Sequence, residues 1–284
     1  MTSHLLRTAL YVPADNAGAL VKAEALGADA VIVDLEDSVA PGAKASARQA
    51  LTALPLHRGL RVIRVNASGT DWHEDDIRAA VATAPDALLL PKASSAEDIW
   101  GFRRLILLCQ PASPIATWAM IETPAGVLNV AAIAAAVGPG GVLVLGLNDL
   151  AKETGMAQAP GRAPMQSVLT QGVIAARAHG IAILDGVFNK IADEPGFEAE
   201  CRQARQFGFD GKTVIHPRQI GPANAIFAPG TEEIAEAEAI VAAFRRPENA
   251  GKGVVALSGR MVERLHRDAA EALLAKAAAI AAKA

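Results

Sequence analysis

The sequence alternates eight times between a short apolar or β-branched run and a longer segment with helical spacing. This alternation predicts parallel strands joined by right-handed crossovers through helices. Since no strand is followed by a G-x-G-x-x-G or Walker-type loop, nothing marks a nucleotide-binding crevice. Eight such repeats favour a closed (β/α)8 TIM barrel over an open doubly wound sheet. The predicted strands cover residues 8–12, 30–34, 61–65, 87–90, 115–121, 141–145, 181–184 and 212–215.

One long uncharged stretch, residues 123–148, raises the question of a membrane span. Pro139-Gly140-Gly141 interrupts this stretch and Asn129 lies inside it, so we predict a helix, a turn and a strand there and no membrane partner. The predicted helices of the barrel cover residues 16–26, 44–54, 75–84, 95–108, 126–137, 165–179 and 195–207.

The composition suits helices packed on parallel strands. Of the 284 residues, 51% are hydrophobic and only 4% are aromatic, which favours an α/β protein over an all-β sandwich. A net charge of −3 gives no reason to expect a nucleic acid or an anionic membrane as partner. The two cysteines, Cys109 and Cys201, have no C-x-x-C spacing, so neither a disulfide framework nor a zinc site is indicated. The short polar N-terminus lacks the regions of a signal peptide, and we expect a cytoplasmic protein.

The chain continues well beyond the eighth strand. We therefore predict a barrel over residues 1–228 and a C-terminal extension over residues 229–284. The extension should contain a helix at 231–244, a strand-like run at 254–257, and a last helix at 267–283. It is either an additional helical layer or a lid, which in an oligomer would cover a neighbouring subunit.

Polar side chains collect at one end of the predicted strands. Active sites of such barrels lie at the C-terminal ends of the strands, and the opposite ends here carry mostly Ala, Gly and Pro. This asymmetry indicates an enzyme. The polar residues at the C-terminal ends are Asp34, Glu36, Asp37, Arg64, Asn66, Lys92, Glu122, Asn148, Asp149, Asp185 and His216.

Two of these acids, Glu122 and Asp149, follow successive strands. Taken alone, each is better explained as a helix N-cap or as an acid in the first turn of a helix, a common use of carboxylates after strands. As a pair they suit a hard cation, because Mg²⁺ typically takes one or two carboxylates and completes its octahedron with water and substrate oxygens. Zinc is not expected, because no His or Cys cluster accompanies the pair.

Three basic residues at the strand ends have both structural and functional interpretations. Arg64 lies inside an apolar strand, where a charge is costly unless it is paired. It should therefore form a salt bridge with an acid after the second strand, bind an anionic substrate, or do both. Lys92 would need a depressed pKa to form an imine. For His216 we expect a structural hydrogen bond.

Several motifs in register resemble one known family. They are Tyr11-Val12-Pro13, Asp34-Leu35-Glu36-Asp37-Ser38-Val39 with Lys44 and Ala47-Arg48, Arg64-Val65-Asn66, Leu90-Pro91-Lys92, Ile121-Glu122-Thr123-Pro124, Leu145-Gly146-Leu147-Asn148-Asp149-Leu150, Gly208-Phe209-Asp210-Gly211-Lys212 and Ile215-His216-Pro217. Together they resemble the citrate lyase β-subunit-like branch of the HpcH/HpaI aldolase superfamily, which includes malyl-CoA and citramalyl-CoA lyases. The resemblance runs from about Arg7 to Leu273.

The resemblance implies a (β/α)8 barrel with a C-terminal lid often donated to the adjacent subunit of a homotrimer or a hexamer. It implies Mg²⁺ bound by Glu122 and Asp149, and Arg64 in contact with the oxo acid or the acyl oxygen. The implied chemistry is reversible Claisen cleavage of a 3-hydroxyacyl thioester to an oxo acid and an acetyl- or propionyl-thioester.

The lid motif departs from the family pattern. CoA-ester lyases of this family usually read Gly-Lys-Met-Ile-Asp-x-Pro, in which the Asp supplies acid/base chemistry. Residues 259–265 here read Gly-Arg-Met-Val-Glu-Arg-Leu, so Glu263 replaces that Asp. Because small misplacements of a reacting group are costly, the rate or the substrate should be altered. Asn148 also stands where an acid often precedes the metal aspartate.

These features predict an Mg²⁺-dependent acyl-CoA lyase that cleaves a citramalyl-, malyl- or citryl-type CoA thioester. Its catalytic residues would be Glu263 and Arg64, with Arg64 and Glu122 binding substrate and Glu122 and Asp149 binding the metal. Two alternatives are the β-subunit of a citrate lyase, acting on an acyl-carrier-protein thioester, and a non-catalytic homologue that binds an acyl-CoA or an oxo acid.

Overall fold

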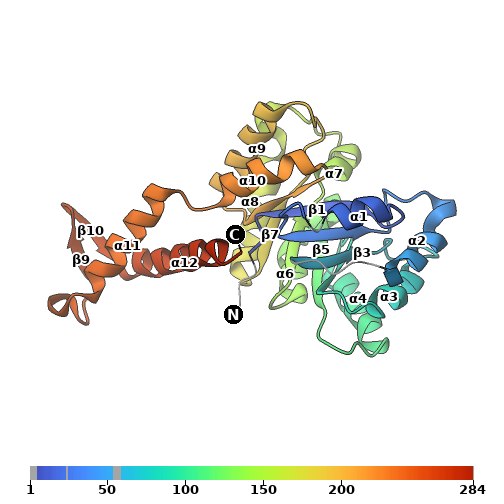
Figure 1. The fold of residues 1–284 in the computed structure, drawn as a ribbon, viewed down its shortest axis with the longest axis horizontal. Coiled ribbons are helices and arrows are strands. Elements are labelled where there is room, and N and C mark those ends of the chain that lie inside the picture. The colour runs from blue at the N-terminus through green and yellow to red at the C-terminus, as the bar shows by residue number, and fades with distance from the viewer. Residues whose placement is uncertain (1–4, 24, 54–58, 284) are drawn as a thin grey trace. The chain divides into compact units, whose positions relative to one another are not determined.

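The first part of the chain is a closed barrel of eight parallel strands. In this computed structural model, which describes residues 5–23, 25–53 and 59–283, each strand pairs with its neighbours in sequence, and β1 also pairs with β8. Helices lie on the outside of the strands (Figure 1). The predicted (β/α)8 barrel is thus confirmed. The strands are β1 (Thr8–Pro13), β2 (Ala30–Asp34), β3 (Leu60–Arg64), β4 (Ala87–Leu90), β5 (Ala116–Ile121), β6 (Val142–Leu145), β7 (Ala182–Asp185) and β8 (Gly211–Val214).

The α-helices follow the prediction with three exceptions. Two helices, α7 and α10, were not predicted. The expected helix at 126–137 is two helices, because the chain turns at Asn129, whose side-chain amide donates to the carbonyl of Ser94. Residue 24 of the predicted helix 16–26 and residue 54 of the predicted helix 44–54 lie outside the described residues. The α-helices of this part are α1 (Ala17–Ala23), α2 (Lys44–Ala50), α3 (His73–Val81), α4 (Ala96–Leu108), α5 (Pro124–Leu128), α6 (Val130–Val137), α7 (Leu147–Thr154), α8 (Gln166–Ala178), α9 (Glu194–Phe207) and α10 (Ile220–Phe227).

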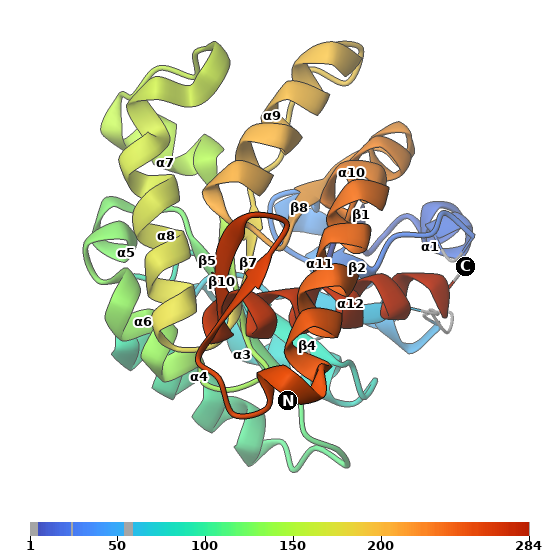
Figure 2. The same cartoon turned by 90° about the vertical axis from the view of Figure 1, so that its left-hand side faces the viewer.

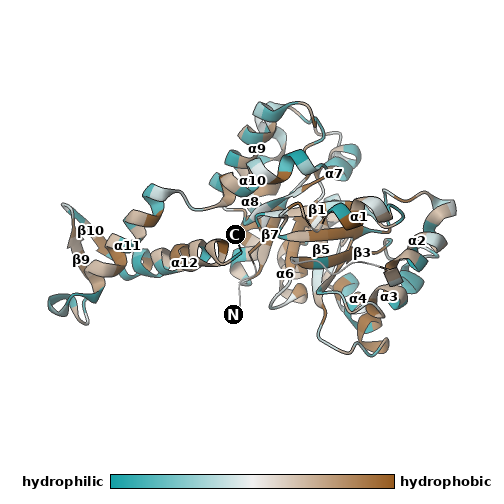
Figure 3. Cartoon of the chain, in the orientation of Figure 1, coloured by the Kyte–Doolittle hydropathy of each residue, from teal (hydrophilic) through white to brown (hydrophobic). Residues whose placement is uncertain are grey.

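The barrel strands have two apolar faces, as expected for strands covered by helices on one side and by one another on the other. Figure 3 shows the strands coloured as apolar and the helices as mixed. One set of buried side chains packs between strands and helices and includes Val31, Val33, Ile63 and Leu88. The alternate set fills the barrel interior and includes Ile32, Val62, Leu89, Trp118 and Val144. Because side chains fill the interior of the barrel, a ligand site is expected at the C-terminal ends of the strands and not inside the barrel.

The chain divides into two compact units, Met1–Phe227 and Ala228–Ala284. The second unit contains α11 (Thr231–Arg245), a hairpin of β9 (Val254–Leu257) and β10 (Arg260–Glu263), and α12 (Arg264–Ala281). The two helices lie side by side, with the hairpin at one end of the pair (Figures 1 and 2). Strand β10 was not predicted, since Ser258 and Gly259 were expected to lead into the last helix. The unit has its own small core, formed by Ala237, Ile240, Val241, Ala243, Val255, Val262 and Ala270.

Helices long and apolar enough to cross a membrane are absent from the residues that the structure describes. The uncharged stretch at 123–148 is occupied by α5, α6 and β6, with the beginning of α7, as the helix–turn–strand interpretation requires.

Candidate functional site

Glu122 follows β5 directly, and its side chain is completely buried. Its Oε1 accepts a hydrogen bond from the backbone N–H of Lys92 at 2.8 Å. Its Oε2 has no hydrogen-bond partner within the described part of the chain. Burial, followed by the neighbouring Glu36 carboxylate, raises the pKa of Glu122 to about 8. A buried carboxylate oxygen without a donor is costly, and a cation would satisfy it.

Gly146, at the end of β6, provides the space for this carboxylate. A Cβ atom at position 146 would collide with Oε2 of Glu122 and lie 2.5 Å from its Cβ. The two strands place these residues side by side, because Ile121 pairs with Leu145 and the N–H of Gly146 donates to the carbonyl of Ile121 at 3.0 Å. Only glycine at this position leaves the Glu122 carboxylate in place.

Asp149 lies in the first turn of α7 and is half-buried. Its charge contributes to the raised pKa of Glu122, after burial and Glu36. The capping explanation does not account for Glu122, since Thr123 caps α5 by accepting from the N–H of Gly126 at 3.0 Å. Helix α7 has Gly146 at its N-cap and no side-chain cap there. Asp149 is nevertheless an acid in the first turn of α7, which is the structural alternative predicted for it, so its role as a metal ligand stays a prediction.

Arg64 ends β3, and its guanidinium is buried among acids. It makes a bidentate ion pair with Asp34, with Nε to Oδ1 and Nη2 to Oδ2 both at 2.7 Å. Its Nη1 lies 2.8 Å from Oε2 of Glu36, although the orientation of the two groups does not form a hydrogen bond, and 3.4 Å from Oδ2 of Asp37. Burial alone would raise the pKa of Asp34, but Arg64 outweighs it and holds that pKa below its usual range. The predicted salt bridge to an acid after the second strand is thus found.

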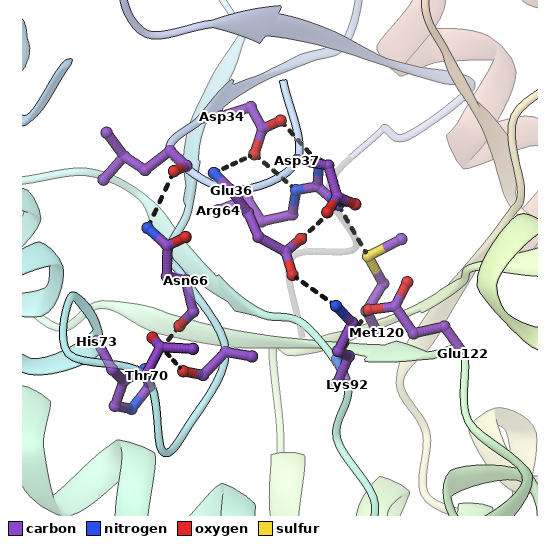
Figure 4. A network of polar contacts seen from close by, with 12 residues as sticks. Asp34, Glu36, Asp37, Arg64, Asn66, Thr70, His73, Lys92, Met120 and Glu122 are labelled. Carbon is purple, nitrogen blue, oxygen red and sulfur yellow. Dashed lines mark hydrogen bonds and ion pairs between the residues drawn. The ribbon is translucent and has the colours of Figure 1, made fainter. Parts of the chain in front are cut away.

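Glu36 and Lys92 connect the Arg64 guanidinium with Glu122 (Figure 4). Nζ of Lys92 lies 3.4 Å from Oε1 of Glu36. Burial raises the pKa of Glu36 to about 7, although Arg64 acts in the opposite direction. Burial would lower the pKa of Lys92, but the Glu36 and Asp37 carboxylates outweigh it and raise that pKa. An imine-forming lysine needs the opposite shift, so Lys92 does not suit that chemistry. We name this group the Glu122 cluster: Asp34, Glu36, Arg64, Lys92 and Glu122.

The backbone of Lys92 has φ of 53°, in the left-handed region that non-glycine residues seldom adopt. This conformation accompanies the hydrogen bond from its N–H to Glu122. A costly backbone geometry persists only when surrounding contacts hold it, and such geometry concentrates at functional sites.

Other polar residues at the strand ends shape the loops. Asn66 is buried and donates to the carbonyl of Leu35 at 2.9 Å. Lys44 donates to the carbonyls of Leu35 and Glu36, both at 2.7 Å. His216 accepts a hydrogen bond on Nδ1 from the N–H of Arg218 at 3.2 Å, as expected for a structural role. These contacts hold the loops without requiring a ligand.

Asp185 belongs to a second buried group, which the sequence did not reveal. Its carboxylate is bound by Nζ of Lys212 at 2.7 Å and by Nη1 of Arg162 at 2.7 and 2.8 Å. Glu200 accepts a further bond from Lys212 at 2.7 Å. We name these four residues the Asp185 cluster. Arg162 lies in an irregular Gly- and Pro-containing segment, so no periodic pattern indicated it.

A cavity of about 330 Å³ lies beside the Asp185 cluster, between the loops that follow β6 and β7. Asn148, Gln158 and Asn189 are among its lining residues, but Arg64, Glu122 and Asp149 are not. The cavity therefore adjoins the metal candidates through Asn148 and is not itself the carboxylate site.

Glu263, the predicted acid/base residue, belongs to the second unit. It ends β10 and is exposed, and its backbone N–H donates to Nδ1 of His266 at 2.9 Å. Its catalytic role stays a prediction.

Magnesium fits the residues of this site. The candidates are two carboxylates, and Gly146 keeps the space beside one of them, Glu122. One buried oxygen of Glu122 receives no hydrogen bond from the residues that the structure describes. Across the described residues there is no group of three or more His, Cys, Asp or Glu arranged to hold a metal, so a denser site such as a zinc centre is not indicated there. Glu122 and Asp149 would hold the ion, and water and substrate would supply its other oxygens.

Residues 7–217 match the model of the HpcH/HpaI aldolase/citrate lyase family. The chain is 46% identical over 285 aligned residues to a (3S)-malyl-CoA thioesterase of Cereibacter sphaeroides, covering 99% of this chain and 97% of that protein. It is 34% identical to the citrate lyase subunit beta of Escherichia coli, covering 95% and 93% of the two chains. It is 32% identical to an L-malyl-CoA/beta-methylmalyl-CoA lyase of Cereibacter sphaeroides, covering 97% and 96%.

A solved structure agrees with these sequence relatives. CitE of Mycobacterium tuberculosis, crystallised with magnesium, acetoacetate and coenzyme A, superposes with a TM-score of 0.79 at 34% identity, covering 96% of this chain and 98% of that one. The resemblance predicted from the motifs is confirmed. This chain belongs to the HpcH/HpaI aldolase/citrate lyase family.

Proposed function

We propose that this protein is an Mg²⁺-dependent enzyme that acts on a malyl-type CoA thioester and hydrolyses its thioester bond. The buried Oε2 of Glu122, which has no donor among the described residues, carries the metal part of the proposal. The reaction is suggested by the (3S)-malyl-CoA thioesterase, which is 46% identical over nearly the full length of both chains. The predicted lyase reaction therefore becomes the second candidate.

Glu122 and Asp149 are the proposed metal ligands. The N–H of Lys92 holds Oε1 of Glu122, so the carboxylate presents Oε2 in a fixed orientation. When bound, Mg²⁺ would polarise a substrate carbonyl and hold the oxygens of the acid portion. Structures of a relative with magnesium and acetoacetate or pyruvate support a site for an oxo acid beside the metal.

Arg64 is the proposed electrostatic partner of the acyl oxygen. Two of its nitrogens are fixed by Asp34, which leaves Nη1 on the side of Glu36 and Asp37. A preorganised cation in a site largely shielded from water stabilises developing negative charge more strongly than it would in solution. Glu263 is the proposed acid/base residue of the second unit.

Hydrolysis and cleavage give different products from the same thioester. Hydrolysis breaks the bond between the carbonyl carbon and sulfur, and water supplies the hydroxyl of the acid and the proton of the thiol. From malyl-CoA it releases malate and free CoA. Claisen cleavage breaks the C2–C3 bond and gives glyoxylate and acetyl-CoA, in which the thioester is intact.

The deciding experiment incubates malyl-CoA with the protein, with Mg²⁺ or with EDTA. A thiol reagent detects free CoA, and phenylhydrazine detects the oxo acid. We expect thiol release that depends on Mg²⁺, without a matching amount of oxo acid. Turnover that is unchanged in EDTA, or in Glu122→Gln, would overturn the metal assignment.

Claisen cleavage is favoured by a different observation. A metal site beside a buried arginine suits an enolate as well as a tetrahedral oxyanion, and one full-length relative is a malyl-CoA/beta-methylmalyl-CoA lyase. Oxo acid formed together with acetyl-CoA, with no free thiol, would establish this reaction. Turnover only when the thioester is carried by an acyl carrier protein would favour the citrate lyase β-subunit. Binding of oxo acid without turnover of any thioester would favour a non-catalytic homologue.

Assembly and location are proposals of the same kind. We propose a cytoplasmic homotrimer or hexamer in which the second unit serves as a lid. Light scattering on the eluting protein would test the assembly, and a monomer would contradict it.

A further inference from the structure

The position of Asp149 depends on how the first turn of its helix, α7, is held in place. It lies in the first turn of α7, which has no side-chain cap at Gly146. The preceding residue, Asn148, makes side-chain hydrogen bonds from this turn. Its Oδ1 accepts from Nδ2 of Asn189 at 2.8 Å and from Nε2 of Gln158 at 2.9 Å, and its Nδ2 donates to Oδ1 of Asn189 at 3.3 Å. We name Asn148, Gln158 and Asn189 the amide trio.

The amide trio joins three separate segments. Asn148 belongs to α7, Gln158 to the loop that follows this helix, and Asn189 to the loop between β7 and α9. All three residues are exposed, and all three line the 330 Å³ cavity. Since their hydrogen bonds are between neutral amides at the surface, their main effect is to restrict where the first turn of α7 lies.

The loop that carries Gln158 is itself anchored at Arg162. The Arg162 guanidinium is buried, with Nη1 bound to both carboxylate oxygens of Asp185 and Nε donating to Oε1 of Gln203 at 2.9 Å. Gln203 in turn donates to the carbonyl of Gly161 at 2.6 Å. The Arg162 backbone has φ of 51° and ψ of 34°, a left-handed conformation that surrounding contacts must maintain.

Arg162 is held in place by the Asp185 cluster, in which each buried charge lies beside an opposite charge. Lys212 is fully buried and donates to Asp185, to the carbonyl of Gly186 and to Glu200. Burying such ions is a weak source of stability, because their desolvation offsets most of the attraction. Their positions are nevertheless fixed by several hydrogen bonds at once, which suits a group that holds a loop in one place.

We propose that the amide trio and Arg162 are positioning residues that fix Asp149 and thereby set the affinity of the site for Mg²⁺. This inference rests on the proposed metal site. Magnesium requires nearly ideal octahedral geometry, so a small shift of one carboxylate weakens binding. Outer-shell partners of metal ligands typically change metal affinity about 10- to 100-fold when they are removed.

The test measures metal binding without substrate. Mn²⁺, which also binds carboxylate oxygens, is titrated into the full-length protein, and the free ion is followed by electron paramagnetic resonance. We expect Gln158→Ala and Asn189→Ala to weaken Mn²⁺ binding about tenfold.

The matched control is Gln166→Ala. Gln166 is exposed and donates to the carbonyl of Gly161 in the same loop, at 3.4 Å. None of the hydrogen bonds found among the described residues joins it to the amide trio. Its Mn²⁺ affinity should equal that of the wild type. Arg162→Lys should weaken binding less than Arg162→Met, because the lysine keeps a charge beside Asp185; thermal unfolding of both verifies the fold.

The outcomes separate this inference from the metal site on which it rests. Wild-type affinity in both Gln158→Ala and Asn189→Ala would overturn the positioning role alone. Absence of specific Mn²⁺ binding to the wild type, with Glu122→Gln indistinguishable from it, would overturn the metal site and the positioning role together. A weakened Gln166→Ala variant would show that any loop change suffices, which also contradicts the specific role of the trio.

Discussion

The two buried ion clusters of the barrel differ in how completely their charges are matched. In the Asp185 cluster, two cations meet two carboxylates, and Lys212 has three acceptors. Burial would raise the pKa of Asp185, but Lys212 and Arg162 outweigh it and hold that pKa below its usual range. In the Glu122 cluster, Glu36 and Glu122 have pKa values raised to about 7 and about 8, and Oε2 of Glu122 has no donor among the described residues.

This difference is the one expected between a structural cluster and a site that binds a ligand. A cluster whose ions are already paired gains little from an added cation. A cluster with excess buried carboxylate is unfavourable by itself, and binding a cation removes the excess. Unfavourable electrostatics in the free protein are common at functional sites and are one way to recognise them.

The variant Glu122→Gln tests the difference between the two clusters most directly. In Glu122→Gln, the amide oxygen can still accept from the N–H of Lys92, but the charge that would hold Mg²⁺ is lost. Since a metal supplies several kcal/mol of transition-state stabilisation, we expect thioester turnover to fall about a thousandfold. Urea unfolding in EDTA should show unchanged or increased stability, because the variant removes a carboxyl group whose ionisation is opposed by burial. A variant that is strongly destabilised would mean that Glu122 is a structural residue like Asp185.

Asp185→Asn should give the opposite pattern. The substitution leaves the charges of Lys212 and Arg162 buried with only Glu200 to balance them. Breaking a buried pair by removing one partner typically costs 3–5 kcal/mol, so we expect a loss of about 3 kcal/mol in urea unfolding. Turnover per folded molecule at saturating Mg²⁺ should change much less than in Glu122→Gln. Stability equal to wild type would show that the Asp185 cluster is not the structural one.

The pH dependence of stability sharpens the same contrast. The folded-state pKa values of Glu36 and Glu122 lie above the ordinary 4.5, so the folded protein binds more protons than the unfolded chain between pH 4.5 and about 8. The stabilising contribution of these groups is therefore complete below pH 4.5 and is lost as pH rises toward 8. The contribution of Asp185 to stability depends on pH in the opposite direction, because its pKa is lowered on folding. This contribution is present above pH 3.8, the ordinary pKa of the group, and is lost only as the pH falls below that value.

Urea unfolding in EDTA at pH 5.5, 6.5 and 7.5 measures this effect. We expect the metal-free wild type to lose stability across this range, and Glu122→Gln to lose less. Saturating Mg²⁺ should add stability most strongly at pH 7.5, since the ion binds the deprotonated carboxylates. Identical slopes for wild type and Glu122→Gln would contradict the raised pKa of Glu122.

The sequence showed which polar residues lie at the strand ends, but it showed fewer of the contacts that these residues make. Arg64 was expected to pair with an acid after the second strand because a charge in an apolar strand requires a partner, and Asp34 is that partner. The Mg²⁺ candidates were identified from their places after two strands. Helix α7, which carries Asp149, was missed because it is short and polar and follows β6 after a single residue.

The contacts that were missed depend on parts of the chain that are distant in sequence. Arg162 approaches Asp185 only because a left-handed turn reverses the loop before α8. The need for glycine at 146 arises from the register of β5 with β6, which brings this backbone against Glu122. That register cannot be predicted from the spacing of hydrophobic residues or from the residues of the local turns.

The smallest predicted effect tests this close approach. In Gly146→Ala, the new methyl group meets the Glu122 carboxylate, which must move away. The methyl group would also lie 2.5 Å from the Cβ of Glu122, so the whole residue has to shift and not the carboxylate alone. Overpacking of this kind typically costs about 1–3 kcal/mol, and we expect a loss within that range. The affinity for Mn²⁺ should fall by a larger factor than the free energy of unfolding does, since the displaced oxygen is a proposed metal ligand.

Gly101→Ala is the matched control for this variant. Gly101 is exposed in the interior of α4, and a Cβ atom there would meet no atom of another segment within 4 Å. Alanine in a helix is more favourable than glycine by roughly 0.5–1 kcal/mol, so this variant should be slightly stabilised and bind Mn²⁺ like the wild type. If Gly146→Ala also kept wild-type Mn²⁺ affinity, Oε2 of Glu122 would not be a metal ligand. The contrast between the two clusters would then reflect unequal burial alone.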